Sequence, residues 1–226
     1  MKHNIMHHIS DDLLLEYASG ALAEGFSIAV ATHLALCPSC RKRLAAMEGV
    51  GGEMLASMVC APSAQDDSWA EFRDRLQYKD PRPATKATPF SADRLNEADR
   101  AIPEPLRSYL GGSLTAVKWR PLGLGAFHYP IATGEGGASA RLLRIPAGKP
   151  VPEHGHAGRE LTLVLSGAFT SQGDYFGPGD LEEEDSDSEH QPVATPEREC
   201  ICLAVTDAPL RFKSRLVRLL QPLLGI

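Results

Sequence analysis

The sequence HLALCPSC at residues 33–40 constrains the fold more than any other part of this chain. Its histidine and two cysteines have the spacing His-x3-Cys-x2-Cys. Side chains four apart share one face of a helix, so His33 at a helix end and Cys37 just beyond it can reach one point. Pro38 suits the first position of a new helix, because its missing N–H is not needed there, and Cys40 follows one turn later. The segment therefore predicts a junction of two helices that carries three metal-binding side chains.

A closed structural zinc site takes four ligands, so a fourth ligand is expected elsewhere in the chain. His8 is the best candidate, although His3 and His7 lie close to it in the sequence. Ser10 is a suitable N-cap for the helix that follows, and a helix hairpin would return His8 to the cysteines. The predicted zinc ligands are His8, His33, Cys37 and Cys40.

The spacing of Cys37 and Cys40 also occurs in thioredoxin-like redox pairs, which is the second interpretation of this segment. Such pairs normally follow a strand in a βαβ unit, whereas no strand pattern precedes Cys37 and residues 10–58 have a helical pattern throughout. Two unrelated thiols are the third interpretation. Ligand spacing favours the zinc site over both.

The overall composition is that of a soluble globular protein of 226 residues, of which 43% are hydrophobic. The net charge of −6 and the pI of about 5.8 argue against a general binder of nucleic acid or of membrane surfaces. No apolar run approaches the roughly 20 residues that span a bilayer, and the N-terminus lacks the core of a signal peptide. With five cysteines and no secretion signal, we expect reduced thiols in the cytoplasm.

The first half of the chain has helical periodicity. Helices are expected from residue 10, over 26–36, over 38–58 and over 69–76. Gly25 is expected to break the chain between the first two helices. In the third helix, Leu44, Met47 and Leu55 are expected to face inward.

The short fourth helix carries an apolar face. Trp69, Phe72 and Leu76 lie on one side of it, at positions i, i+3 and i+7. This face either packs on the first three helices or is offered to a partner. Periodicity favours packing on the first three helices.

The second half of the chain has β-type patterns, so the fold class expected is α+β with several domains. Five prolines among polar residues at 81–105 predict an interdomain linker. Short β-like runs separated by Gly- and Pro-rich turns then predict an antiparallel barrel or jelly roll. The expected runs lie at residues 116–120, 127–131, 141–145, 161–165, 168–170, 200–205 and 211–215. We expect a zinc-stabilised helical domain at 1–80, the linker at 81–105 and the barrel at 106–226.

A second group of metal-type side chains lies in the predicted barrel. His154 and His156 are two apart on a strand and point to the same side, and Glu160 opens the next strand across a tight turn. His190 is the natural fourth member. Three imidazoles and one carboxylate suit zinc, iron, manganese or copper. The alternative is a barrel with incidental histidines and no metal, and the acidic residues between 182 and 189 are most simply a solvated loop.

The pattern Gly-x5-His-x-His-x3-Glu-x6-Gly, from Gly148 to Gly167, resembles the first cupin motif at every fixed position. Residues 176–180 together with His190 resemble the second cupin motif more loosely, because the spacing is longer and Ala194 replaces the usual asparagine. The resemblance implies a cupin barrel with zinc or another divalent metal. The ligands it implies are His154, His156, Glu160 and His190.

The combination of a His-x3-Cys-x2-Cys helical domain, an upstream histidine and a C-terminal cupin resembles the ChrR group of anti-sigma factors over nearly the whole chain. The resemblance implies that the helical domain holds zinc and clamps a group IV (extracytoplasmic-function) sigma factor. It also implies that the cupin is needed for the response to singlet oxygen or related oxidants. On this basis we expect a non-enzymatic, cytoplasmic negative regulator of transcription that contacts neither nucleic acid nor membrane directly.

Two other functions are kept open. A metal-dependent cupin enzyme, an oxygenase or isomerase, would use the second site, although no further acid or base stands out near it. A thiol sensor would lose zinc when Cys37 and Cys40 are oxidised.

Cys200 and Cys202 lie two apart on a predicted strand, where a bridge would be strained, so we expect small buried barrel residues there. Cys60 is expected at a helix end or in a linker.

Overall fold

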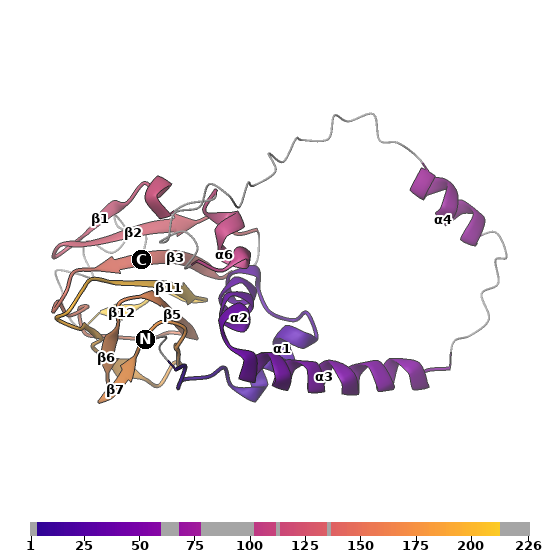
Figure 1. The fold of residues 1–226 in the computed structure, drawn as a ribbon, viewed down its shortest axis with the longest axis horizontal. Helices are drawn as coiled ribbons and strands as arrows, with labels where there is room; N and C mark the ends of the chain where they lie inside the picture. Colours follow the sequence, from indigo (N-terminus) through magenta and orange to yellow (C-terminus); the bar gives the residue numbers. More distant parts are fainter. Residues whose placement is uncertain (1–3, 60–67, 78–101, 112–113, 135–136, 213–226) are drawn as a thin grey trace.

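The computed structural model describes residues 4–59, 68–77, 102–111, 114–134 and 137–212. N-terminal helices lie against one side of an antiparallel β domain, and the first seven described residues run along that domain before the first helix begins (Figure 1). The expected α+β fold with a cupin-like barrel is confirmed. Among the helices described, none has the length and apolar character that crossing a membrane requires.

The first three helices are α1 (Asp11–Ala18), α2 (Glu24–Leu36) and α3 (Pro38–Ser57). The Ser10 hydroxyl accepts the Leu13 N–H, so Ser10 is the N-cap of α1 as the sequence predicts. Cys37 ends α2 by donating its N–H to the His33 carbonyl at 2.8 Å, and Pro38 then begins α3. The predicted helix junction is therefore confirmed.

Gly25 does not break the chain, contrary to the sequence-based expectation. It lies in the first turn of α2, and the positive φ of 72° that reverses the chain belongs to Gly20. A Cβ atom on Gly25 would lie 3.1 Å from Val205 Cγ1 on the sheet. The glycine therefore permits a close approach of α2 to the barrel.

The fourth helix, α4 (Ser68–Gln77), does not pack its apolar face on the first three, so that expectation is wrong. Trp69 is 66% exposed, Phe72 48% and Leu76 69%, and Figure 1 shows α4 apart from the other helices. In α3, Leu44 and Met47 pack against the core as expected, whereas Leu55 is 71% exposed. The reason is length, because α3 continues beyond the end of α1 and α2 (Figure 1).

The β domain consists of three antiparallel sheets. The six-stranded sheet has the order β1-β2-β3-β11-β5-β8, and the two small sheets have the orders β10-β6-β7 and β12-β4-β9. The strands are β1 (Arg120–Gly123), β2 (Ala126–Ile131), β3 (Ser139–Ile145), β4 (His154–Gly155), β5 (Glu160–Ser166), β6 (Phe169–Ser171), β7 (Asp174–Phe176), β8 (Leu181–Glu184), β9 (Glu189–His190), β10 (Val193–Ala194), β11 (Cys200–Thr206) and β12 (Arg211–Phe212). The strand expected at 116–120 is wrong, because a 3-10 helix at Leu114–Ala116 precedes β1.

Helices and barrel share one hydrophobic core. α2 is apolar around most of its circumference because it packs on β3, β5 and β11 on one side and on the other helices elsewhere. Val30 and Leu34 of α2 belong to the same buried cluster as Leu163 and Leu203 of the sheet. A short helix, α6 (Glu104–Tyr109), packs against α2 as well.

The proline-rich linker expected at 81–105 lies mostly outside the described residues. At its described end, Ile102 is 1% exposed and belongs to the shared core. The division of the chain at residues 80 and 105 therefore stays a prediction.

Candidate metal centres

The first cluster lies where α2 and α3 meet the segment that precedes α1. His33 Nε2 is 3.3 Å from Cys40 Sγ, and His8 Nδ1 is 3.3 Å from Cys37 Sγ and 3.6 Å from Cys40 Sγ. The four ligand atoms all lie within 4.8 Å of one another. Tetrahedral zinc with ordinary bond lengths would place sulfur and nitrogen ligands about 3.6 Å apart. The arrangement therefore fits a single four-coordinate cation.

The chemical state of the first cluster also suits a metal. His33 Nδ1 pairs with the Gly179 carbonyl at 2.9 Å, which orients Nε2 toward the thiols. Burial lowers the pKa of His33 to about 4, so the imidazole is neutral at pH 7 and has a free lone pair. Burial raises the pKa of the Cys40 thiol, and a bound cation would reverse that effect by stabilising the thiolate.

The structure separates His8 from its neighbour His7. The His7 ring points away from the cluster, with Nε2 3.1 Å from the Tyr175 carbonyl and its centroid 4.1 Å from that of Phe176. His3 lies outside the described residues. The structure thus brings together the four residues that the sequence selects, and zinc binding by them stays a prediction.

The second cluster lies inside the barrel. His190 Nε2 is 3.1 Å from His154 Nε2 and 3.2 Å from His156 Nε2, and Glu160 Oε2 is 3.1 Å from His156 Nδ1. The exposed fraction of each of the four residues is 6% or less. β4 and β9 set this geometry, because His154 and His190 are register partners.

Unpaired atoms test whether the second cluster fits a metal. Within the described part of the chain, no well-aligned hydrogen bond reaches the buried atoms His156 Nδ1 and Glu160 Oε2, although the two lie 3.1 Å apart. Buried polar atoms are rarely left unpaired, and a cation between them would satisfy both. His154 Nδ1 pairs with the Pro152 carbonyl at 2.8 Å, which leaves Nε2 free for a metal.

Charge in the second cluster favours a cation as well. Burial raises the pKa of Glu160, but the imidazoles of His154 and His156, which lie 3.8 and 3.1 Å from Oε2, outweigh it and hold the pKa well below its usual range. For His190, burial lowers the pKa, yet the neighbouring Glu182 outweighs it and the net shift is upward. An ionised carboxylate among buried imidazoles is a suitable ligand set for a divalent metal.

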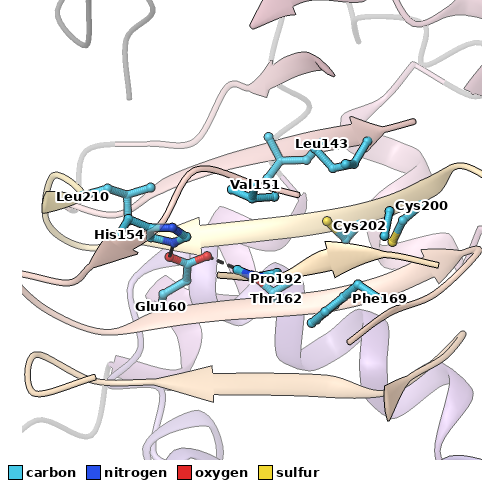
Figure 2. A pocket seen from close by; sticks show the side chains of 12 residues that line it. Leu143, Val151, His154, Glu160, Thr162, Phe169, Pro192, Cys200, Cys202 and Leu210 are labelled. Carbon is cyan, nitrogen blue, oxygen red and sulfur yellow. Dashed lines mark hydrogen bonds and ion pairs between the residues drawn. The ribbon is translucent and has the colours of Figure 1, made fainter. Parts of the chain in front are cut away.

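A small apolar cavity of about 60 Å³ adjoins the second cluster (Figure 2). Figure 2 shows His154 and Glu160 at one end of it and Cys200 and Cys202 further along. Both cysteines are free and at most 4% exposed, which confirms the expectation of small buried barrel residues. A hydrogen bond with Cys200, together with burial, raises the pKa of the Cys202 thiol well above its usual value. Cys60 lies outside the described residues.

The acidic residues after position 181 are not simply a solvated loop, so this expectation is wrong in part. Glu182 and Glu184 lie on β8, and Glu182 is only 5% exposed. Side chains alternate along a strand, so these two face the barrel interior whereas Glu183 faces outward and accepts the Ser10 hydroxyl at 3.0 Å. Asp185 and Asp187 are exposed, as expected for a loop.

Sequence reasoning missed the residue that joins the two halves. Asp180 is fully buried, and its Oδ1 accepts the backbone N–H groups of Met6 and His7 at 2.7 and 2.9 Å. The segment that carries His8 is thereby fixed to the barrel. An aspartate that follows a Gly-Pro-Gly turn was a visible signal, but nothing in the sequence indicated its partners.

Comparisons with known proteins cover almost the whole chain. The ChrR cupin-like domain family matches residues 110–209. The anti-sigma-E factor ChrR of Cereibacter sphaeroides is 48% identical over 223 residues, which span 98% of this chain and 99% of that protein.

Solved structures agree with these matches. The crystal structure of Rhodobacter sphaeroides SigE in complex with the anti-sigma ChrR matches with a TM-score of 0.75 and 44% identity, over 90% of this chain and 100% of that chain. An RmlC-like cupin protein from Ralstonia eutropha matches at a TM-score of 0.40 and 19% identity, over 46% of this chain and 71% of that one. Because the ChrR relative is nearly half identical along almost its full length, this chain belongs to the ChrR family of anti-sigma factors.

Proposed function

We propose that this chain binds and inhibits an extracytoplasmic-function sigma factor in the cytoplasm and releases it on an oxidative signal such as singlet oxygen. The observation that carries the proposal is the exposed apolar surface of α3 and α4. Support also comes from the related ChrR chain, which was crystallised with SigE.

The apolar surface continues along α3 beyond the shared core. Its exposed members are Val50, Met54 and Leu55 on α3, Met58 at the C-cap of that helix, and Trp69, Phe72 and Leu76 on α4. Large apolar side chains at i, i+4 spacing on an exposed helix are typical of a surface that a protein partner covers. A sigma factor that covers these helices would be kept from RNA polymerase.

The first cluster would fix the orientation of α3, which carries part of that apolar surface. Cys37, which belongs to the cluster, is the N-cap of α3, and Arg43 of α3 donates to the Ile9 carbonyl at 2.8 Å and to the Asp11 carboxylate at 3.1 Å. We propose zinc as the metal held by His8, His33, Cys37 and Cys40. A bound zinc ion would fix α3 relative to α1 and α2.

The barrel would receive the signal. We propose that His154, His156, Glu160 and His190 hold zinc or another divalent metal, which supplies a Lewis-acidic centre beside the apolar cavity. The small volume of the apolar cavity argues against the alternative, a metal-dependent cupin enzyme. The cavity of about 60 Å³ is far below the roughly 300 Å³ at which pockets for organic substrates begin.

Co-purification with the sigma factor tests the proposal with a matched pair of variants. The full chain, His8→Ala and His7→Ala are each expressed with the extracytoplasmic-function sigma factor of the source genome, and transcription from its promoter is measured in vitro. We expect His8→Ala to lose zinc, complex formation and inhibition, and His7→Ala to keep all three. Inhibition that survives in zinc-free His8→Ala would refute the role of the metal, and no complex with the unmodified chain would refute the function.

A further inference from the structure

Glu182 in the barrel is a buried carboxylate with an unused oxygen. Its side chain is 5% exposed, and Oε2 has no hydrogen-bond partner among the described residues. The ion pair of Glu182 with His190 uses Oε1, so Oε2 is a buried carboxylate oxygen that still lacks a cation or hydrogen-bond donor, which is unfavourable. No lysine or arginine forms a described ion pair with it.

The same place holds a second carboxylate and an imidazole nitrogen. Glu182 Oε1 and Glu184 Oε1 lie 3.4 and 3.5 Å from His190 Nδ1. One ligand atom from each of these three residues can be chosen so that all lie within 4.8 Å of one another. β8 supplies both carboxylates from one face because they are two residues apart, and β9 supplies the imidazole.

His190 has two nitrogens that point to different groups. Nε2 faces His154 and His156 in the second cluster, whereas Nδ1 faces the two carboxylates and the Ser171 hydroxyl at 3.2 Å. A metal-bound histidine commonly donates its other N–H to one carboxylate. That role accounts for one carboxylate, and Glu184 Oε1 also accepts the Gln172 amide N–H at 3.2 Å, but the buried Glu182 Oε2 stays without an explanation.

An open cleft of about 470 Å³ leads to this place from solvent. It lies between the N-terminal segment and the β6–β8 part of the barrel, and it is separate from the apolar cavity of Figure 2. Its polar lining includes His7, His8, Ser171, Glu182 and Glu184. A hydrated cation can therefore reach the carboxylates without passing through the apolar cavity.

We propose that Glu182, Glu184 and His190 Nδ1 form a further divalent-cation site, back to back with the second cluster and sharing His190 with it. When both sites are filled, His190 bridges the two cations as an imidazolate, and its Nδ1 proton passes to water in the cleft. Two carboxylates balance a charge of +2, and water from the cleft completes the coordination. Carboxylate, imidazole and water are the ligand set of manganese and iron as well as zinc. This proposal is independent of the sigma factor, since the site needs no partner.

Manganese binding tests the site, because free Mn²⁺ is counted directly by electron paramagnetic resonance. The full chain, loaded with two equivalents of zinc so that only the two four-ligand clusters are filled, is titrated with Mn²⁺ at neutral pH. We expect one additional Mn²⁺ per chain. Glu182→Gln with Glu184→Gln should weaken this binding at least tenfold, whereas Asp187→Asn, which removes one charge from the exposed turn of the same acidic stretch, should not change it.

Two further variants separate this site from the second cluster. His156→Ala removes a ligand of that cluster only, so Mn²⁺ binding should persist, whereas His190→Ala should abolish it. Glu184→Gln alone is the fallback if the double variant fails to fold, because Glu184 is not fully buried. The proposal is overturned if the chain takes up no additional Mn²⁺. It is equally overturned if the glutamate variants bind Mn²⁺ like the unmodified chain, or lose only zinc.

Discussion

The two histidine clusters have similar ligand geometry but different supports. In the first cluster, the ligands come from a loop segment and two helices, and the His33 ring is held by a carbonyl of the barrel. In the second cluster, the ligands lie on strands or beside them, and those strands are already paired by backbone hydrogen bonds. A metal in the first cluster would therefore hold separate segments together, whereas a metal in the second would bind between strands that are folded without it.

The comparison teaches that equal ligand number does not mean equal contribution to stability. α1 has eight residues, and its buried side chains are only Leu13 and Leu14, so it has little core of its own. The barrel in contrast has a seven-residue strand, β5, that pairs with β11 on one side and β8 on the other, and its first six residues are all buried. Four sets of variants test whether the two clusters contribute differently to the stability of the fold.

The largest effect is expected from Cys40→Ser in the first cluster. Loss of the metal should unfold α1 and the start of α3, since structural zinc contributes on the order of 10 kcal/mol to small metal-held folds. Hydrogen–deuterium exchange should rise in residues 4–20 and 38–47, with β5 and β11 still protected. Unchanged exchange in those segments after zinc loss would show that the shared core alone holds the helices.

A smaller effect is expected from His156→Ala in the second cluster. The variant should lose the barrel metal, but the barrel should remain folded, because its strands keep their backbone pairing. Loss of the His156 imidazole beside the buried Glu160, which keeps Thr162 and His154 as neighbours, should cost about 1–3 kcal/mol of the free energy of unfolding. Urea denaturation followed by circular dichroism gives the value, and a loss as large as that of Cys40→Ser would remove the contrast between the clusters.

The contact between α2 and the sheet can be tested without touching either cluster. In Gly25→Ala, the new methyl group lies 3.1 Å from Val205 Cγ1, so we expect a loss of about 1 kcal/mol. Gly49→Ala makes the same change in α3, where nothing lies within 4 Å, and helix propensity should stabilise it by up to about 1 kcal/mol. Thermal melts of the two variants should shift in opposite directions. Equal shifts would mean that α2 lies farther from β11 of the barrel than the structure shows.

Local chemistry made much of this molecule predictable. Spacing over a few residues predicts three features that the structure has: the N-cap at Ser10, the helix junction at Cys37 and the proximity of His154 to His156. Most of the two groups of four candidate ligands follow from spacing as well, while His8 was added from the expected helix hairpin and His190 from the turn and the cupin motif; the structure brings each group together.

Long-range packing explains the errors. Gly25 looks like a chain break, and only the position of Val205 on a distant strand explains why a glycine is needed inside the helix. Leu55 and Trp69 follow the period of a buried helix face, but a period does not indicate whether a neighbour is present. The burial of Glu182 was missed because charge, rather than the two-residue alternation of β8, dominated its interpretation.

The smallest effect concerns the ion pair that joins α1 to the barrel. Glu16 accepts two hydrogen bonds from Arg159, at 2.8 and 3.1 Å, and these bonds lower the pKa of the Glu16 carboxyl below its usual 4.5. Stabilisation by such a group is complete above the unfolded-state pKa and is lost as the pH falls through the lower folded-state value. Because both side chains are at least one third exposed, we expect only a few tenths of a kcal/mol.

A comparison of Glu16→Gln with the unmodified chain measures this ion pair. Their urea midpoints should differ slightly at pH 7 and converge at pH 3, whereas Glu48→Gln, at an exposed position in the middle of α3, should leave the midpoint nearly unchanged at both pH values. A difference that persists at pH 3 would mean that Glu16 contributes by packing rather than by charge. A difference of several kcal/mol at pH 7 would mean that this ion pair, more than the first cluster, holds α1 against the barrel. The first cluster would then contribute less to stability than the comparison of the two clusters implies.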